Sequence, residues 1–356
     1  MVDIVTFDPG KHSAAWDEFV AANYRNPNYV LLSPAYLRWQ FLDNPANGTG
    51  AYTLWLVLHE GAIVALMGFA PFVGHSPAGG RFTGAYPMNL MVRPDYRASG
   101  LGVVLLRRLL KEYPTVVNPG SSEAGAILCM GLGMQDFGHL RRHVAILDAE
   151  AARGLAADNR LPAGVAEAPR QAAAGGVMAA IRLPDRTPPL FSFPIPVHGV
   201  ERSRDFLRWR YEDHPGFAYE FLLSEDLQNI LVFHEEREAG SGALVIRIID
   251  LLASGATQDA LLRTALQIAR SRGAILADFF CSLTCYDSAL QRAGFFDEAD
   301  HQDGRIAALF QPLDFRKTGI RVLVSAPAGK TAADWYISKG DSDQDRPNDR
   351  RSIRGA

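Results

Sequence analysis

The sequence is poor in cysteine and has no long apolar run. Its 356 residues include three cysteines, Cys129, Cys281 and Cys285, which form neither a disulfide framework nor a metal-ligand pattern. We therefore expect a reducing, cytoplasmic setting. No stretch approaches the roughly 18 apolar residues that a membrane span needs, and the first residues carry acids where a signal peptide would have an apolar core. These absences predict an intracellular protein without a membrane span.

An excess of charge of one sign is also missing. The 36 Lys and Arg residues nearly balance the 39 Asp and Glu residues, which leaves a formal net charge of -3. A general nucleic-acid binder needs a basic surface, so we expect no nucleic-acid partner. The length of the chain is enough for two domains with a substantial core. The sequence leaves the oligomeric state open.

One glycine-rich turn joins a strand signal to a helix signal. Residues 86–92 are typical of an apolar strand, Pro94 interrupts it, and a helix pattern begins after Gly100. The turn itself reads R-x-x-G-x-G from Arg97 to Gly102. Backbone amides in such a turn point outward, and the helix N-terminus adds a partial positive charge. Glycine also allows positive φ and a close approach to a ligand. The turn therefore predicts a binding site for an anion such as a diphosphate.

Two segments of the chain are similar to each other. Residues 206–215, FLRWRYEDHP, repeat residues 36–45, YLRWQFLDNP. Strand signals follow both segments, and then a helix and a further strand, so the same element order occurs twice. This order predicts a duplicated fold of mixed α/β class. The second copy has Ala253–Asp259 at the turn, without the arginine and the paired glycines, so we expect one phosphate site and not two.

The pattern V-x-P-x-Y-R-x-x-G-x-G, here Val92 to Gly102, resembles the GNAT acyltransferase superfamily, as does the element order. In that family the turn cradles the pyrophosphate of acyl-CoA, and the preceding strand diverges from its neighbour and hydrogen-bonds the pantetheine arm. The resemblance implies acetyl-CoA or another acyl-CoA as co-substrate. The residues that it implies for binding are Met91, Val92, Arg97, Ala98, Ser99, Gly100, Leu101, Gly102 and Val103.

The whole chain is more narrowly similar to tandem-GNAT proteins that acylate amino-sugar nucleotides for surface polysaccharides. This similarity implies two tandem GNAT-like domains: an acyl-CoA-binding domain at 1–150, an Ala/Gly/Pro-rich connection at 151–197, a degenerate domain at 198–325 and a tail at 326–356. The implied reaction moves an acyl group from CoA to a primary amine, with an amino-sugar nucleotide as the best guess. We expect the substrate in the cleft between the domains.

Acylation of an amine needs a base for the amine proton and a donor for the oxyanion. The backbone N–H of Met91 or Val92 is the expected donor. Many GNAT enzymes have a Glu base where this chain has Tyr86, and a Tyr acid where it has Cys129. The candidate catalytic residues are therefore Tyr86, Asp250 and His139. Tyr86 is as readily a packing residue, and an acid within an apolar strand, such as Asp250, must be paired or face a cleft.

The C-terminal tail carries three alternating acids, Asp341, Asp343 and Asp345. They resemble a calcium loop only in their spacing, because the glycine and the glutamate of such a loop are absent. We expect no metal site.

Two other functions fit the resemblance. One is an aminoacyl-tRNA-dependent transferase of the peptidoglycan type, which also has paired GNAT domains. The slight excess of acidic residues and the intact turn at Arg97–Gly102 are evidence against this alternative. The other is a non-catalytic acyl-CoA-binding protein, which agrees with the missing Glu and Tyr.

Overall fold

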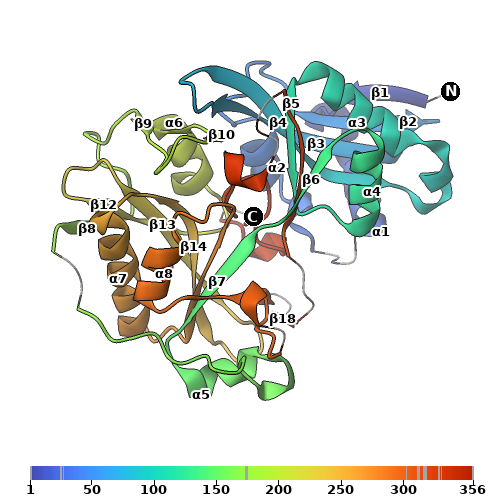
Figure 1. The fold of residues 1–356 in the computed structure, drawn as a ribbon. Helices are drawn as coiled ribbons and strands as arrows, with labels where there is room; N and C mark the ends of the chain where they lie inside the picture. Colours follow the sequence, from blue (N-terminus) through green and yellow to red (C-terminus); the bar gives the residue numbers. More distant parts are fainter. Residues whose placement is uncertain are drawn as a thin grey trace.

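The computed structural model describes residues 2–24, 26, 28–172, 175–301, 303–310, 313–315, 319–327, 329 and 331–354. Two lobes are visible, and each contains a large sheet of parallel and antiparallel strands with helices against it (Figure 1). The predicted mixed α/β class is confirmed. In the part of the chain that the structure describes, no helix is both long and apolar enough to cross a bilayer.

The first sheet has the strand order β1-β2-β3-β4-β5-β19-β6, and the short strands β10 and β20 extend it beside β3. Its strands are β1 (Val2–Thr6), β2 (Leu54–His59), β3 (Ala62–His75), β4 (Arg81–Val92), β5 (Thr115–Pro119), β19 (Arg321–Ser325), β6 (Gln135–His139), β10 (His198–Val200) and β20 (Trp335–Tyr336). The helices of this lobe are α1 (Pro9–Asn23), α2 (Pro34–Phe41), α3 (Leu101–Glu112) and α4 (Glu123–Gly131).

The second sheet has the order β8-β12-β13-β14-β15-β7-β16. Its strands are β8 (Val177–Ala180), β12 (Tyr219–Ser224), β13 (Ile230–Arg237), β14 (Leu244–Leu252), β15 (Leu276–Cys281), β7 (Arg141–Ile146) and β16 (Phe296–Asp297). The other elements are α5 (Ala149–Ala152), α6 (Arg204–Leu207), α7 (Ala256–Ser271), α8 (Asp287–Ala293), β9 (Leu190–Phe191), β11 (Arg202–Ser203), β17 (Leu309–Phe310) and β18 (Leu313–Asp314). Along the two seven-strand orders, the strand directions match position by position, and the parallel pair β4–β5 of the first sheet corresponds to the parallel pair β14–β15 of the second.

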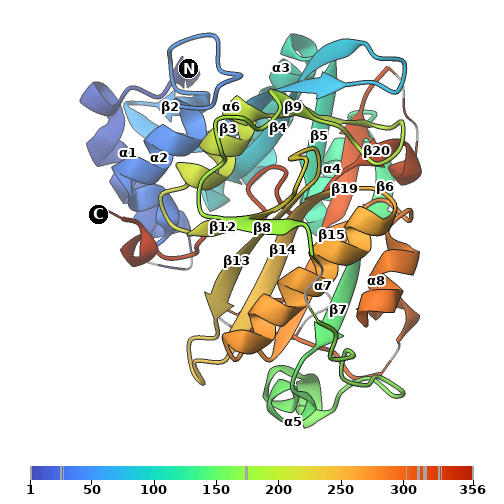
Figure 2. The same cartoon turned by 90° about the vertical axis from the view of Figure 1, so that its left-hand side faces the viewer.

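The seven-strand order of each sheet includes one strand from the other half of the chain. β7 follows β6 after the single residue Leu140, yet it pairs between β15 and β16 of the second sheet. β19 comes from near the C-terminus and pairs between β5 and β6 of the first sheet. Figure 1 shows β7 running from the first lobe into the second, and Figure 2 shows β19 beside β6. The sequence from His139 to Leu147 is typical of one strand; in the structure Arg141–Ile146 form β7, whereas His139 is the last residue of β6 in the other sheet.

The glycines and prolines between Gly74 and Gly84 favour a loop by composition, but most of this stretch belongs to the strands β3 and β4, and only residues 76–80 turn. A Cβ added to Gly74 would lie 2.3 Å from the ring of Phe82, and one added to Gly84 would lie 2.3 Å from the ring of Phe72. The glycines therefore make room for aromatic rings on the adjacent strand, and they do not mark a turn.

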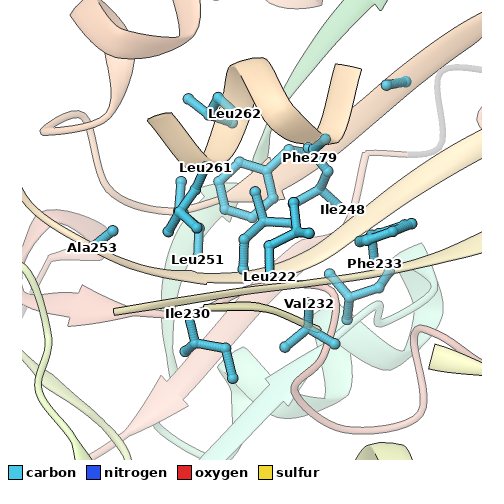
Figure 3. Packing of buried hydrophobic residues seen from close by; sticks show 14 of the residues in the cluster. Leu222, Ile230, Val232, Phe233, Ile248, Leu251, Ala253, Leu261, Leu262 and Phe279 are labelled. Carbon is cyan, nitrogen blue, oxygen red and sulfur yellow. The ribbon is translucent and has the colours of Figure 1, made fainter. Parts of the chain in front are cut away.

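An amphipathic helix covers the second sheet. The buried positions of α7 recur at intervals of three and four residues and include Leu261, Leu262 and Ala265. Figure 3 shows Leu261 beside Leu251 of β14, within a cluster to which Phe279 of β15 also belongs. Burial of each large side chain of this kind contributes about 1.5–3 kcal/mol, so the cluster is a main source of stability in this lobe.

The two repeated segments meet where the lobes touch. The indole Nε1 of Trp39 donates to the carbonyl of Trp209 at 2.7 Å, and Nε1 of Trp209 donates to the carbonyl of Trp39 at 2.8 Å. The two rings are stacked, with their centroids 5.4 Å apart. Equivalent residues that exchange identical contacts indicate an approximate two-fold relation between the copies.

Candidate functional site

The turn between β4 and α3 has the geometry of an anion site. Residues Pro94–Ser99 form a 3₁₀ turn, and Gly100 follows in the left-handed conformation with φ 77°. The first amides of α3, which begins at Leu101, have no acceptor within the helix, so they are available to a ligand. A Cβ added to Gly100 would meet no atom within 4 Å, so glycine serves the backbone angle here and leaves the approach open.

The arginines around this turn differ in their freedom. Arg93 pairs with Asp95 at 2.7 Å and lies over the ring of Tyr96, 4.7 Å from its centroid. Arg97 is exposed and has no ion-pair partner among the described residues. Arg97 is therefore the guanidinium that can reach an anion bound at the turn.

β4 and β5 diverge beside this turn. Their parallel pairing is limited to Gly84 with Thr115 and Ala85 with Val116. Gly84 permits the close approach, because a Cβ there would lie 2.8 Å from the carbonyl oxygen of Thr115. Pro87 remains paired with Phe69 of β3, but it has no amide N–H to donate to β5. The sequence of β4 thus closes the strands at Gly84 and opens them beyond Ala85.

A cavity of about 310 Å³ fills the opening, and we call it the slot. One wall is β4 from Pro87 to Met91, and the opposite wall is the end of β5 with α4. The third side is formed by the C-terminal tail together with two tyrosines that follow α1. The polar residues that line the slot are Tyr24, Tyr29, Asn89, Asn118, Ser121, Ser122, Asp343, Gln344 and Arg346.

The residues predicted to bind acyl-CoA follow one path along the slot and the turn. Met91 lines the slot, and a Cβ added to Gly102 would lie 3.7 Å from the Val92 side chain. The 3₁₀ turn carries Arg97, Ala98 and Ser99, and Gly100 leads into the first turn of α3. That first turn contains Leu101, Gly102 and Val103. Their role in binding acyl-CoA stays a prediction, and their arrangement agrees with it.

Two of the predicted catalytic residues lie in a buried charged cluster between the lobes. The hydroxyl of Tyr86 donates to Asp341 at 2.8 Å. Arg202 joins this aspartate, at 2.9 Å, to Asp250, at 2.6 Å. Asp250 is fully buried and also accepts hydrogen bonds from the hydroxyls of Tyr211 and Tyr336. Of the two arrangements expected for an acid in an apolar strand, Asp250 has the paired one.

This environment limits what Tyr86 can do. Burial, and then the charge of Asp341, raise the pKa of the Tyr86 hydroxyl well above its ordinary value. A hydroxyl with a raised pKa stays protonated at neutral pH and is a poor proton acceptor. Tyr86 and Asp250 are not among the residues that line the slot.

The third predicted catalytic residue, His139, lies elsewhere. It is exposed at the end of β6 and lines a separate cavity of about 290 Å³, together with Arg142 and Glu298. The structure therefore brings Tyr86 and Asp250 into one cluster but places His139 apart from them. A catalytic role for these three residues stays a prediction, and none of them lies on the slot.

The residue at the position of the usual Tyr acid does line the slot. The Asn118 amide donates to Ser121 Oγ at 2.7 Å and to Cys129 Sγ at 3.3 Å. Burial raises the pKa of the Cys129 thiol, so it stays protonated at neutral pH. The neighbours of Cys129 in the sequence, Leu128 and Met130, are apolar, so the local pattern alone favours a core position and does not indicate the slot.

Sequence reasoning also missed the tail. Asp341, Asp343 and Asp345 are only 1%, 8% and 2% exposed, although a polar tail is ordinarily solvated. Residues 341–345 form turns and bends, so no strand periodicity in the sequence indicates which way each acid faces. Within the described ranges, no group of three or more His, Cys, Asp or Glu residues could hold a metal ion.

No model of a known protein family matches the sequence, and no curated protein sequence matches it either. Solved structures do match the fold. A GCN5-related N-acetyltransferase from Anabaena variabilis superposes with a TM-score of 0.56 at 12% identity, over 91% of this chain and 72% of that one. One from Kribbella flavida gives 0.54 at 15% identity, over 91% and 70%. A conserved protein of unknown function from Enterococcus faecalis gives 0.51 at 10% identity, over 91% and 72%.

These likenesses cover nearly the whole chain, so both lobes take part in them. The chain has the fold of the GCN5-related N-acetyltransferases. At 10–15% identity the comparison establishes the fold and leaves the reaction to the site.

Proposed function

We propose that the protein is an N-acyltransferase that uses acetyl-CoA or another acyl-CoA. The observation that carries the proposal is the continuity of the turn at Gly100 with the slot between β4 and β5. A diphosphate held at the N-terminus of α3 directs the rest of the molecule along the unpaired edge of β4. This edge offers backbone N–H and C=O groups to the amides of a pantetheine arm.

The chain supplies separate groups for the two ends of the co-substrate. Arg97 and the amides of Leu101, Gly102 and Val103 hold the diphosphate. At the thioester end, the N–H of Met91 or Val92 stabilises the oxyanion that forms on the carbonyl. The protonated thiol of Cys129, held by Asn118, donates a hydrogen bond to the leaving thiolate.

The acceptor enters on the side of the tail. There the rings of Tyr24 and Tyr29 stack with centroids 4.5 Å apart and an interplanar angle of 15°. Their hydroxyls point to Asn89, both at 3.4 Å. Aromatic faces and amide groups suit a polar ring that carries hydroxyls. Together with the resemblance, this favours a primary amine on a nucleotide-linked sugar as the acceptor.

Release of free thiol from acetyl-CoA tests this function. The purified protein is mixed with acetyl-CoA and, in turn, amino-sugar nucleotides, simple primary amines or aminoacyl-tRNA. Thiol release only with amino-sugar nucleotides supports the proposal in full, and release with simple amines supports acyl transfer with another acceptor. Aminoacyl transfer from tRNA without use of acetyl-CoA supports the peptidoglycan-type alternative. Tight binding of CoA without turnover of any acceptor supports a binding protein and contradicts the enzyme.

A further inference from the structure

One carboxylate faces the slot, and it comes from the C-terminal tail. Among the described residues that line the slot, Asp343 is the only acid, Arg346 is the only base, and there is no histidine. Burial raises the pKa of the Tyr24 and Tyr29 hydroxyls and of the Cys129 thiol. These three groups therefore stay protonated at neutral pH, and Asp343 is the group on the slot that can take up a proton.

The two outer acids of the tail hold the middle one in place. Asp341 accepts from Arg202 at 2.9 Å and from the amide of Ser338 at 2.9 Å. Asp345 pairs with His234 at 3.1 Å and accepts from the hydroxyl of Tyr219 at 2.6 Å. Both anchors are buried on the interior side of the tail. Asp343, halfway between them, is thus presented to the slot by a segment that is fixed at both ends.

The tail also crosses the slot at a defined point. A Cβ added to Gly120, directly after β5, would lie 2.1 Å from Oε1 of Gln344, so the tail packs against the backbone there. Beyond the slot, Asn26 donates to the carbonyl of Asn348 at 2.8 Å, and the amide of Arg350 donates to the carbonyl of Asn28 at 2.7 Å. The tail is therefore a built wall of the slot on the acceptor side.

The hydrogen bonds of Asp343 leave room for a substrate. Its Oδ1 accepts from the Gln344 amide at 3.0 Å and from the Ser342 hydroxyl at 3.4 Å, and its Oδ2 pairs with Arg346. A carboxylate has about four acceptor positions, so one position is still available. Besides Arg346, the titratable groups around the pair are the hydroxyls of Tyr24, Tyr29 and Tyr36.

We propose that Asp343 is the general base of the transfer, a role that rests on the proposed function. As the amine nitrogen bonds to the thioester carbon, it becomes positively charged and gives a proton to the Asp343 carboxylate. The tetrahedral intermediate then collapses, the C–S bond breaks, and the thiolate takes up the proton. The products are the amide and free CoA. Arg346 positions the carboxylate through the ion pair with its Oδ2.

The test compares two aspartates that lie two residues apart. Asp343→Asn removes the base, whereas Asp345→Asn makes the same change at a buried anchor away from the slot. For Asp343→Asn we expect kcat to fall about 10²- to 10⁴-fold, with the affinity for CoA within about twofold of wild type. Asp345→Asn loosens one anchor of the tail but keeps the Asp343 carboxylate, so we expect a lower midpoint of thermal unfolding and a clearly smaller loss of kcat than for Asp343→Asn. Asp343→Glu keeps a carboxylate and should recover part of the lost rate.

Three results would overturn the assignment. The first is a kcat for Asp343→Asn within about threefold of wild type, because the contribution of a base is larger than that. The second is a parallel loss of CoA affinity, which would make Asp343 a structural part of the slot. The third is equal damage to kcat in both aspartate variants. If the wild-type protein transfers no acyl group to any amine, the proposed function fails, and the base with it.

Discussion

The two lobes contain the same opening between parallel strands, but only the first keeps it empty. In the first lobe, the β4–β5 pairing ends at Ala85 and Val116, and a cavity follows. In the second lobe, the β14–β15 pairing ends at Ile248 and Phe279, and protein fills the space beyond it. A β-bulge interrupts the pairing with the preceding strand in both lobes, between Leu66 and Gly68 and between Val232 and Phe233.

Tyrosine hydroxyls close the second opening. The amide of Leu251 donates to the hydroxyl of Tyr336 at 3.0 Å, and the hydroxyl of Tyr286 donates to the carbonyl of Leu251. Both tyrosines are buried, and the tail adds a bridge between Cys281 and Ser338. The backbone groups that a pantetheine arm would need are therefore satisfied by side chains.

The turns that precede α3 and α7 differ in the same way as the two openings: the first is open to a ligand, and the second is filled by side chains. In the second lobe, Gln258 donates to the carbonyl of Ala253 at 2.7 Å and folds over the start of α7. Asp259 adds a negative charge in the first turn of α7 and pairs with Arg292 at 2.8 Å. A carboxylate at a helix N-terminus competes with an anionic ligand for the same partial charge. The second lobe therefore lacks both the open turn and the slot.

The largest expected effect concerns the intact turn. Gly100→Glu places a carboxylate where the diphosphate should bind and removes at least two charge-assisted hydrogen bonds, each worth about 1.5–3 kcal/mol. We expect CoA binding, measured by calorimetric titration, to weaken at least about 100-fold. Two variants serve as controls. Gly100→Ala introduces the same strain at a left-handed backbone position but adds no charge. Ser254→Glu adds the same charge to the turn before α7 in the second lobe. Similar losses for Ser254→Glu and Gly100→Glu would contradict the difference between the turns.

The next prediction concerns the buried charged cluster between the lobes. Arg202→Met leaves Asp250 and Asp341 buried without their cation, which costs about 3–5 kcal/mol of unfolding free energy. Arg38→Met breaks the exposed pair of Arg38 with Asp43 and should cost less than about 1 kcal/mol. Denaturant unfolding of both variants measures the difference. Equal costs would show that the cluster is solvated in solution.

A smaller effect tests the two-fold contact itself. Trp209→Phe leaves the Trp39 carbonyl without its donor, and we expect a cost of about 1–3 kcal/mol in unfolding free energy. Trp39→Phe should cost somewhat more, because the Trp39 ring also packs edge-on against His214 at 4.4 Å. Because the two bonds share one interface, the double variant should cost less than the sum. Additive costs would mean that the two indoles act independently.

The smallest expected effect is on the pH dependence of stability, when His214 is replaced by the residue at the equivalent position of the first copy, Asn44. Nδ1 of His214 accepts from the amide of Gly216 at 3.1 Å, as Oδ1 of the equivalent Asn44 accepts from the amide of Ala46 at 2.9 Å. Burial, and then the charge of Arg210, lower the pKa of His214 well below 6.5. Below pH 6.5 the unfolded chain therefore takes up a proton that the folded chain refuses, so this stability is present above pH 6.5 and is lost on acidification.

His214→Asn keeps the acceptor and removes the titration. We expect the unfolding free energy of the variant to change less between pH 7 and pH 5 than that of wild type, by up to about 1.4 kcal/mol per pH unit. Denaturant unfolding at several pH values measures these slopes. Identical slopes would show that His214 is protonated in the folded protein.

The parts of the fold that could be predicted are those with a local cause. The turn at Gly100 needs a positive φ, and the spacing of apolar residues in α7 reports a buried face. The repeated tryptophan segment revealed the duplication. Gly74 and Gly84 misled the prediction, because their cause is an aromatic ring on another strand, which no local pattern shows.

The same holds for the candidate site: only the residues that are contiguous in the sequence could be predicted. The turn and the strand before it are contiguous, so their role follows from one motif. Asp343 reaches the slot from more than 220 residues further along the chain, through anchors on both lobes. Tyr86 and Asp250 are far apart in sequence, and nothing local indicated that Arg202 would join them.

The exchange of β7 and β19 has a consequence for synthesis on the ribosome. The first sheet lacks the strand between β5 and β6 until residue 325 has emerged, since β19 fills that place. The first lobe therefore cannot complete its sheet as an early co-translational intermediate, although N-terminal domains commonly fold first. Pairing across such a long stretch of chain also slows folding. We expect a nascent chain stalled before β19 to remain protease-sensitive at β6, and the slot to be completed as one of the last steps.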